Sequence, residues 1–281
     1  GFNHSYHHPK QHKVPVSEVE ADPAALHNSI FKKIQRHKML TDKRPEECQY
    51  CWNIEDTPGD HFSDRILKSS EPWAIDRLDE VANHKVQENI APSYLEVMFS
   101  HTCNFKCIYC APHISSSIMQ QEKEFGEWPM GHTHLPTVER EGALPLSLDE
   151  EENPYVKAFW KWLPTIYKDL KVLRITGGEP LLSPSTFKVL DYINNSPKHD
   201  LELAINSNLN ATQKKIDELT DYIKKLYDEK KFKSFHLYTS VDTYGEQAEY
   251  IRGGMSYETV FKNLELFLNK VPELNSTIMC T

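Results

Sequence analysis

In the second half of the chain, the arrangement of apolar residues predicts both helices and strands. Apolar residues spaced three and four apart predict helices beginning at Ser183 and spanning residues 212–230 and 256–269. Strands that alternate with helices of this length form parallel βαβ units, so the pattern predicts an α/β fold. Short β-favouring runs predict the strands, at residues 94–99, 172–176, 201–205, 235–241 and 276–281.

The first half of the chain is less regular. Residues 1–25 are polar and rich in histidine, which predicts a mobile tail, and residues 26–40 predict one amphipathic helix. We expect the charged residues 57–92 to form a linker with at most one helix. Two domains follow from this organisation: an extension at residues 1–92 and a core at residues 93–281, whose last strand we expect to be cut off by the end of the chain.

Residues 111–150 show little periodicity, which predicts an insertion or a lid. Near its end, Ser147 and Glu150 have the spacing of a capping box. We therefore expect this pair to open the next helix, which carries Val156 and Phe159 on its apolar side.

Charge and composition narrow the classes of partner. The chain has 41 acidic and 32 basic residues, a net charge of −9, which gives no support to a nucleic-acid partner. We find neither a run of apolar residues long enough for a membrane span nor a signal peptide, so we expect a cytoplasmic protein without a membrane partner. The first residue is Gly1, so we do not expect a complete gene product.

Five of the six cysteines fall in two tight groups, which favours metal or redox chemistry over disulfides. Cys103, Cys107 and Cys110 follow the first predicted strand, and thiolates are soft ligands for iron–sulfur clusters or zinc. Three ligands for a four-iron cluster would leave one iron open. The alternatives are a zinc knuckle completed from elsewhere and reduced core thiols.

Polar groups follow the later strands at the same end of the predicted sheet. Gly177 and Gly178 would let the main chain approach a ligand, and Glu179 before Pro180 could neutralise an ammonium group. The ends of the next two strands offer hydroxyl, amide and carboxylate groups that suit a ribose and an amino-acid head group. These groups belong to Ser207, Asn208, Ser240 and Asp242.

Together these motifs resemble the radical S-adenosylmethionine (SAM) superfamily. Its signature is the C-x3-C-x2-C spacing with an aromatic residue, here Tyr109, before the last cysteine. The Gly-Gly-Glu-Pro turn matches the family's element that contacts the SAM amino group. The segment around Ser207 is similar to the T-N-G element of the peptide-modifying branch, with Leu209 where the glycine usually stands, and Arg252 matches an arginine that meets the SAM carboxylate.

The resemblance implies a partial (β/α) TIM-type barrel with parallel strands, a 4Fe–4S cluster and bound SAM. An electron from a donor such as flavodoxin or ferredoxin would cleave SAM to methionine and a 5′-deoxyadenosyl radical, which abstracts hydrogen from the substrate. No catalytic side chain is implied beyond the cluster and SAM sites. The cluster ligands are Cys103, Cys107 and Cys110, and the SAM site comprises Tyr109, Gly177, Gly178, Glu179, Pro180, Ser207, Asn208, Ser240, Asp242 and Arg252.

Cys48 and Cys51 lie in the extension, in a stretch that resembles the tail of SPASM or twitch modules. This resemblance implies an auxiliary iron–sulfur cluster; zinc or a structural role is the alternative. It also favours a peptide or protein substrate. A small metabolite such as a sugar or nucleotide is the second candidate, and a non-catalytic zinc-binding scaffold is the third. The remaining cysteine, Cys280, is expected to lie in the core.

Overall fold

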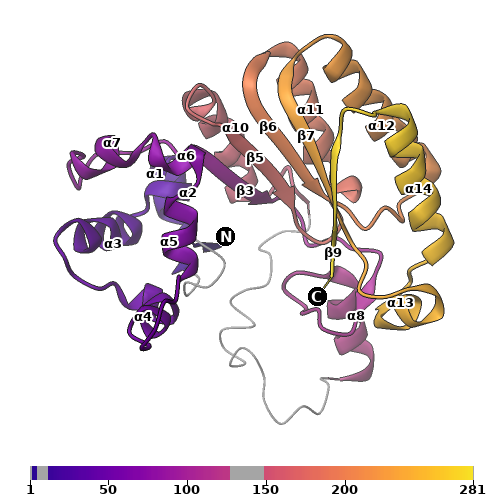
Figure 1. The fold of residues 1–281 in the computed structure, drawn as a ribbon, viewed down its shortest axis with the longest axis horizontal. Helices are drawn as coiled ribbons and strands as arrows, with labels where there is room; N and C mark the ends of the chain where they lie inside the picture. The colour runs from indigo at the N-terminus through magenta and orange to yellow at the C-terminus, as the bar shows by residue number, and fades with distance from the viewer. Residues whose placement is uncertain (1, 5–11, 127–148, 281) are drawn as a thin grey trace. The chain divides into compact units, whose positions relative to one another are not determined.

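A computed structural model of the protein describes residues 2–4, 12–126 and 149–280 (Figure 1). Contacts between residues divide the chain into two compact units. The first unit combines residues 1–94 with 151–171, and the second combines residues 95–150 with 172–281. The helix after the insertion belongs to the first unit, although it follows residue 93 in the chain.

A five-stranded sheet forms the centre of the second unit, in the order β3-β5-β6-β7-β9. The pairings of β5 with β6, β6 with β7, and β7 with β9 are parallel. The prediction of an α/β fold with a parallel sheet is thus confirmed. The strands are β3 (Tyr94–Met98), β5 (Val172–Thr176), β6 (Lys198–Asn206), β7 (Phe232–Ser240) and β9 (Asn275–Met279).

Three helices cover one face of this sheet: α11 (Pro184–Asn195), α12 (Gln213–Asp228) and α14 (Tyr257–Lys270) (Figure 1). Side chains alternate across a strand, so every second residue faces the helices. Leu173 and Leu237, which are fully buried, lie on that face. Burial of such apolar side chains, worth about 1.5–3 kcal/mol each, holds the sheet and helices together.

The sequence pattern missed the short elements of the second unit. Two-residue strands and single turns carry no periodicity to recognise. The segment 111–150 contains a regular helix, α8, although residues 127–148 lie outside the described part. The missed elements are β4 (Lys106–Cys107), α8 (Ser116–Phe125), the 3₁₀ turn η2 (Pro180–Leu182), α13 (Gly245–Ile251) and β8 (Arg252–Gly253).

The first unit is helical, and the expectation of a mobile tail is wrong for the residues from His12 onward. Val14 and Val19 pack with Ala25 and with Tyr155 and Ala158 of α10. The stretch expected to be a linker contains three short helices rather than one at most. The elements are β1 (Phe2–Asn3), β2 (His12–Lys13), α1 (Val16–Ala21), α2 (Ala25–Asn28), α3 (Ile30–Leu40), η1 (Glu46–Cys48), α4 (Gln49–Glu55), α5 (Asp64–Ser69), α6 (Pro72–Ile75), α7 (Leu78–Ala82) and α10 (Pro154–Ile166).

The helix expected at residues 26–40 is broken at Ser29, whose side chain accepts a hydrogen bond from the Lys32 amide and caps α3. The apolar residues of α3 do not face the core: Ile30 is 64% exposed. Lys32 is buried instead, and its ammonium group lies 2.8 Å from a carboxylate oxygen of buried Glu47. Hydrophobic periodicity failed here because the buried partner of the lysine comes from another segment.

The prediction that a capping box with Glu150 opens the next helix is also wrong. Helix α10 is capped by Asn153, whose side chain accepts from the amide of Tyr155. Glu150 instead accepts a 2.9 Å hydrogen bond from the hydroxyl of Ser183, before α11. Ser147 lies outside the described residues.

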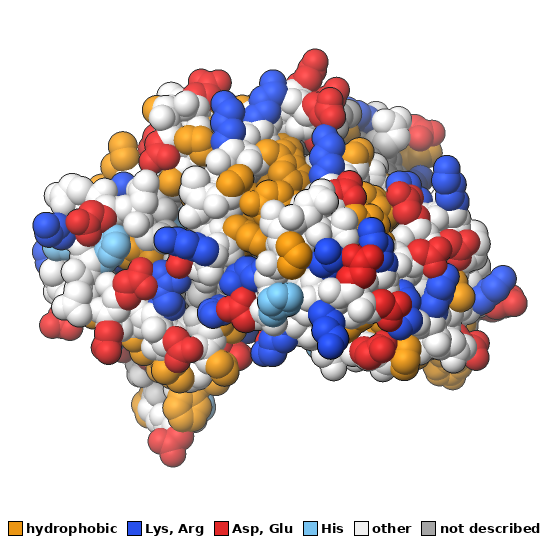
Figure 2. All heavy atoms as spheres, turned by 90° about the horizontal axis from the view of Figure 1, so that it is seen from above, with side chains coloured by type: hydrophobic (Ala, Val, Ile, Leu, Met, Phe, Trp, Pro, Cys, Tyr) orange, Lys and Arg blue, Asp and Glu red, His pale blue; other side chains and the backbone are white. Residues whose placement is uncertain are grey.

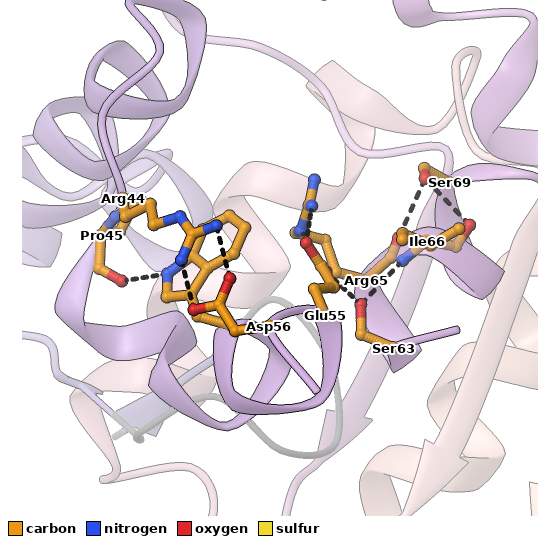
Figure 3. Close-up of polar contacts among 9 residues, drawn as sticks. Arg44, Pro45, Glu55, Asp56, Ser63, Arg65, Ile66 and Ser69 are labelled. Atoms are coloured by element: carbon orange, nitrogen blue, oxygen red, sulfur yellow. Dashed lines mark hydrogen bonds and ion pairs between the residues drawn. The ribbon is translucent and has the colours of Figure 1, made fainter. Parts of the chain in front are cut away.

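Two arginines enclose Trp52 beside the Cys48–Cys51 motif. The guanidinium carbons of Arg44 and Arg65 lie 5.1 and 4.5 Å from the centre of its ring. Each arginine also pairs with an acidic residue of the same segment, as Figure 3 shows for Arg44 with Asp56 and for Arg65 with Glu55. These cation–π and ionic contacts join residues before and after the segment that carries the two cysteines.

The described surface carries charges of both signs. Acidic and basic side chains are interspersed on the face that Figure 2 shows. Among the described helices, none is both long and apolar enough to cross a membrane.

Candidate functional site

The three predicted cluster ligands lie in the loop that follows β3. Its backbone is held by α8: the hydroxyl of Ser116 accepts from the amide of Cys103 at 3.0 Å, and Ser117 donates to the carbonyl of Cys103 at 2.5 Å. The amide of Cys110 donates to the carbonyl of Cys107. Helix α8 therefore supports the outer side of a loop that presents all three thiols.

The three thiols belong to one stretch of eight residues, 103–110. Burial is the main cause that raises the pKa of Cys103, Cys107 and Cys110, and each pKa is raised further by the negative charge of another of the three. No three His, Cys, Asp or Glu side chains of the described residues are grouped as one metal ion would require. Three thiolates are soft donors of the kind that iron–sulfur clusters and zinc both accept.

The glycine pair is required by the cysteine loop itself. Gly177 has a φ of +138°, and a Cβ on Gly178 would lie 2.3 Å from the carbonyl oxygen of Thr102 and 2.5 Å from that of His101. The amide of Glu179 donates to the carbonyl of Thr102 at 2.8 Å. The turn before Pro180 and the start of the cysteine loop are therefore in backbone contact, where the sequence suggested an approach to a ligand.

Glu179 is buried and already has three donors. It accepts from the Leu181 amide (3.0 Å), the Ser207 hydroxyl (2.8 Å) and the Asn208 amide (2.6 Å). Burial raises its pKa to about 7, although these hydrogen bonds act in the opposite direction. Ser207 and Asn208, expected near a ribose, thus orient the carboxylate that was expected to meet an ammonium group.

Leu209 occupies the left-handed region, with a φ of +53°. This conformation explains why glycine usually stands at the position in the matching element. The side chain is fully buried, and the carbonyl of Leu209 accepts a 2.8 Å hydrogen bond from Asn263. Packing and this hydrogen bond hold a strained backbone at the end of β6.

Arg252, expected to meet the SAM carboxylate, is paired within the protein. It donates to both carboxylate oxygens of Asp242, at 2.9 and 3.2 Å, and both side chains are buried. The Tyr109 hydroxyl also donates to Asp242. Ser240 ends β7, where it lies in register with Met279 of β9. The structure thus brings Asn208, after the third strand, and Asp242, after the fourth, into contact with the cysteine loop through Asn104 and Tyr109.

One prediction about the cysteines is wrong. Cys280 is exposed rather than in the core, and its thiol donates to the carbonyl of Asp242 at 3.1 Å. Cys48 and Cys51 are both buried, and burial raises the pKa of Cys48 to about 11. The described residues add no third side chain that would complete a metal site at this pair.

Sequence reasoning missed a polar cluster on the face of the sheet opposite the helices. The guanidinium of Arg174 on β5 lies 4.2 Å from the centre of the Tyr238 ring on β7, and that ring stacks on His236 at 4.1 Å. Arg174 also donates to Asn206 on β6 at 2.9 Å. The alternation of these residues with buried ones is the signal that could have revealed them.

The sequence profile of the Radical SAM superfamily matches residues 97–281, which include the cysteine loop and the later strand ends. The chain therefore belongs to the radical SAM superfamily of enzymes.

Particular relatives can be named within that class. The chain is 30% identical over 116 residues to GTP 3',8-cyclase of Campylobacter jejuni subsp. doylei, covering 41% of this chain and 27% of the relative. It is 26% identical over 126 residues to GTP 3',8-cyclase of Campylobacter lari, covering 45% and 30%. Each match thus spans less than a third of the relative's length. The solved structure titled "Native anSMEcpe with bound AdoMet" is 16% identical with a TM-score of 0.36, covering 66% of this chain and 43% of that one.

Proposed function

We propose that this chain binds a 4Fe–4S cluster through Cys103, Cys107 and Cys110 and cleaves SAM reductively. The observation that carries the proposal is that three soft thiols follow a strand end within the segment that the superfamily profile matches. When bound and reduced, such a cluster supplies the electron that cleaves SAM to methionine and a 5′-deoxyadenosyl radical.

The chain's own residues would bind and orient the cosubstrate. Glu179, once ionised, offers a negative charge to the SAM ammonium group, and Ser207 keeps that carboxylate in place. Tyr109 is 48% exposed as a residue, and we assign its ring to contact with the adenine. Ser240 and Asn208 stand at neighbouring strand ends, where we place the ribose.

The test is anaerobic reconstitution of the chain with iron and sulfide, followed by dithionite and SAM. We expect about four irons per chain and release of 5′-deoxyadenosine. Replacing Cys103, Cys107 and Cys110 with alanine should remove both, whereas Cys280→Ala, which changes an exposed cysteine, should remove neither. A colourless protein that retains zinc and leaves SAM intact would support the scaffold instead. About eight irons would assign an auxiliary cluster to Cys48 and Cys51.

Two substrate classes are favoured by different observations. A nucleotide is favoured by the name of the curated relatives and by the cation and stacked rings of Arg174, Tyr238 and His236. A peptide is favoured by the resemblance of the Ser207 and Cys48 segments to the peptide-modifying branch. Transfer of deuterium into 5′-deoxyadenosine from labelled nucleotides or from labelled peptides distinguishes the two classes. Repeating the reaction with flavodoxin in place of dithionite tests the expected kind of electron donor.

A further inference from the structure

Arg252 and the cluster ligand Cys107 are directly paired across a two-stranded ribbon. Strand β4 pairs antiparallel with β8, so Cys107 lies opposite Arg252 and Lys106 lies opposite Gly253. The amide of Ile108 continues the ribbon with a 2.9 Å hydrogen bond to the carbonyl of Ile251. The backbone that carries the second cysteine is therefore fixed to the backbone that carries the arginine.

Glycines allow this close approach. Gly254 has a φ of +98°, and a Cβ there would lie 2.9 Å from the carbonyl oxygen of Asn104. A Cβ on Gly253 would lie 3.2 Å from the carbonyl oxygen of Lys106. Side chains at these positions would push the ribbon away from the cysteine loop.

The guanidinium group is divided between two partners. Its Nε and Nη2 atoms donate to Asp242, while Nη1 lies 3.7 Å from the sulfur of Cys107. The side chains of Arg252 and Asp242 are only 7% and 6% exposed. The Tyr109 ring lies 5.4 Å from the guanidinium carbon, and its hydroxyl donates to the same Asp242 oxygen that accepts from Nε of Arg252. These contacts leave the Nη1 donor directed at sulfur.

This arrangement differs from an arginine that waits for a carboxylate ligand. One pair of parallel donors, Nε and Nη2, is already used by Asp242. A SAM carboxylate that bound this same pair would have to displace a buried carboxylate from a buried guanidinium, which costs the desolvation of an unpaired charge. The Nη1 group, outside that pair, is placed to act on the sulfur.

We propose that Arg252 is a positioning residue for the cluster: it donates to the thiolate of Cys107, with Asp242 fixing its orientation, and so raises the cluster's reduction potential. The inference rests on the proposed function, because it requires the cluster. A hydrogen-bond donor and a positive charge near a cluster sulfur stabilise the reduced state, which carries one more negative charge. The arginine thereby makes the cluster easier to reduce before SAM binds.

The test is an EPR-monitored redox titration of the anaerobically reconstituted full chain without SAM. Arg252→Gln should lower the ratio of reduced to oxidised cluster at least about tenfold at the wild-type midpoint, a shift of about 59 mV for one electron. Arg252→Lys keeps the charge without the fork, so its midpoint should fall between the two. Tyr109→Phe removes only the contact with Asp242 and should shift the midpoint less than Arg252→Gln.

Lys233→Gln is the matched control. Lys233 pairs with Glu202 near the start of β7, the strand whose other end leads to Asp242, and both side chains are exposed. Loss of this surface charge should leave the midpoint unchanged. An equal shift in this variant would mean that net charge alone sets the potential, which overturns the proposal.

Four further outcomes separate the failure of this proposal from the failure of the proposed function. An unchanged SAM-free midpoint in Arg252→Gln together with weaker SAM binding would assign the arginine to the SAM carboxylate and overturn the proposal. If Arg252→Gln loses iron, the Arg252→Lys midpoint decides, and wild-type behaviour there also overturns it. A wild-type cluster that never cleaves SAM would defeat the proposed function while leaving the redox comparison valid; a wild-type chain that binds no iron would defeat both.

Discussion

The hydroxyl of Ser207, at the end of β6, donates to the carboxylate of Glu179, which follows β5, at 2.8 Å. This hydrogen bond joins two strand ends below the surface of the site, where both side chains are buried. It keeps a carboxyl with a raised pKa in a single orientation.

The burial of Glu179 predicts a pH-dependent stability. Its pKa rises from 4.5 to about 7 on folding, so between these values the folded chain binds more protons than the unfolded chain. The free energy of unfolding of the metal-free protein should therefore be highest below pH 4.5, as far as this group is concerned, and fall by at most about 3 kcal/mol as the pH rises to 7. Urea denaturation at several pH values measures it. Glu179→Gln should lose this component, so parallel curves for variant and wild type would contradict the assignment.

Gly178→Ala should disrupt the contact between the glycine turn and the cysteine loop. The new Cβ would lie 2.3 Å from a backbone oxygen, so we expect a loss of about 3 kcal/mol in unfolding free energy and reduced iron binding after reconstitution. Gly245→Ala is the control, because a Cβ there meets no atom within 4 Å, and only its φ of +57° costs about 1 kcal/mol. Equal losses in the two variants would argue against a specific contact.

At Leu209 we expect a glycine substitution to destabilise the protein no more than an alanine substitution, which is the reverse of the usual order. Leu209→Ala removes buried side-chain volume, at a cost of about 2–5 kcal/mol, and keeps the strained φ of +53°. Leu209→Gly removes slightly more volume but relieves about 1 kcal/mol of strain. We expect the glycine variant to be at least as stable as the alanine variant in urea denaturation. An alanine variant that is clearly more stable would show that the backbone carries no strain.

The buried pair of Lys32 and Glu47 should respond differently to single and double replacement. Lys32→Met leaves an unpaired buried carboxylate, which should cost about 3–5 kcal/mol. Lys32→Met with Glu47→Leu removes both charges and should recover most of that loss. The two unfolding free energies, compared with those of the exposed pair variant Arg44→Gln, measure the effect. Additive losses in the double variant would contradict an interaction between the two side chains.

The sequence was sufficient to predict the alternating strands and helices of the second unit. Residues 172–176 were predicted with the bounds that the structure has, because an apolar run between turn residues is a local signal. The wrong face of α3 shows the limit, since burial of Lys32 depends on Glu47, which periodicity within one helix does not reveal. The β4–β8 ribbon could not be predicted because each of its strands has two residues.

The sequence predicted which residues belong to the site but not which of them form hydrogen bonds with one another. Asp242 was selected from its place at a strand end and Arg252 from the resemblance, with SAM as the expected partner of each. Their pairing depends on α13, a single short helix between them that the pattern did not indicate. Glu179 was likewise expected to face a ligand, while the structure gives it donors from its own turn and from the next strand end.

The ribbon between β4 and β8 sets an order of events during synthesis. Its two halves are separated by more than a hundred positions along the chain, so a nascent polypeptide cannot complete the ribbon until Gly253 has left the ribosome. The second cysteine of the loop thus acquires its strand partner only after residue 253 has been made, from a segment that contributes no cysteine.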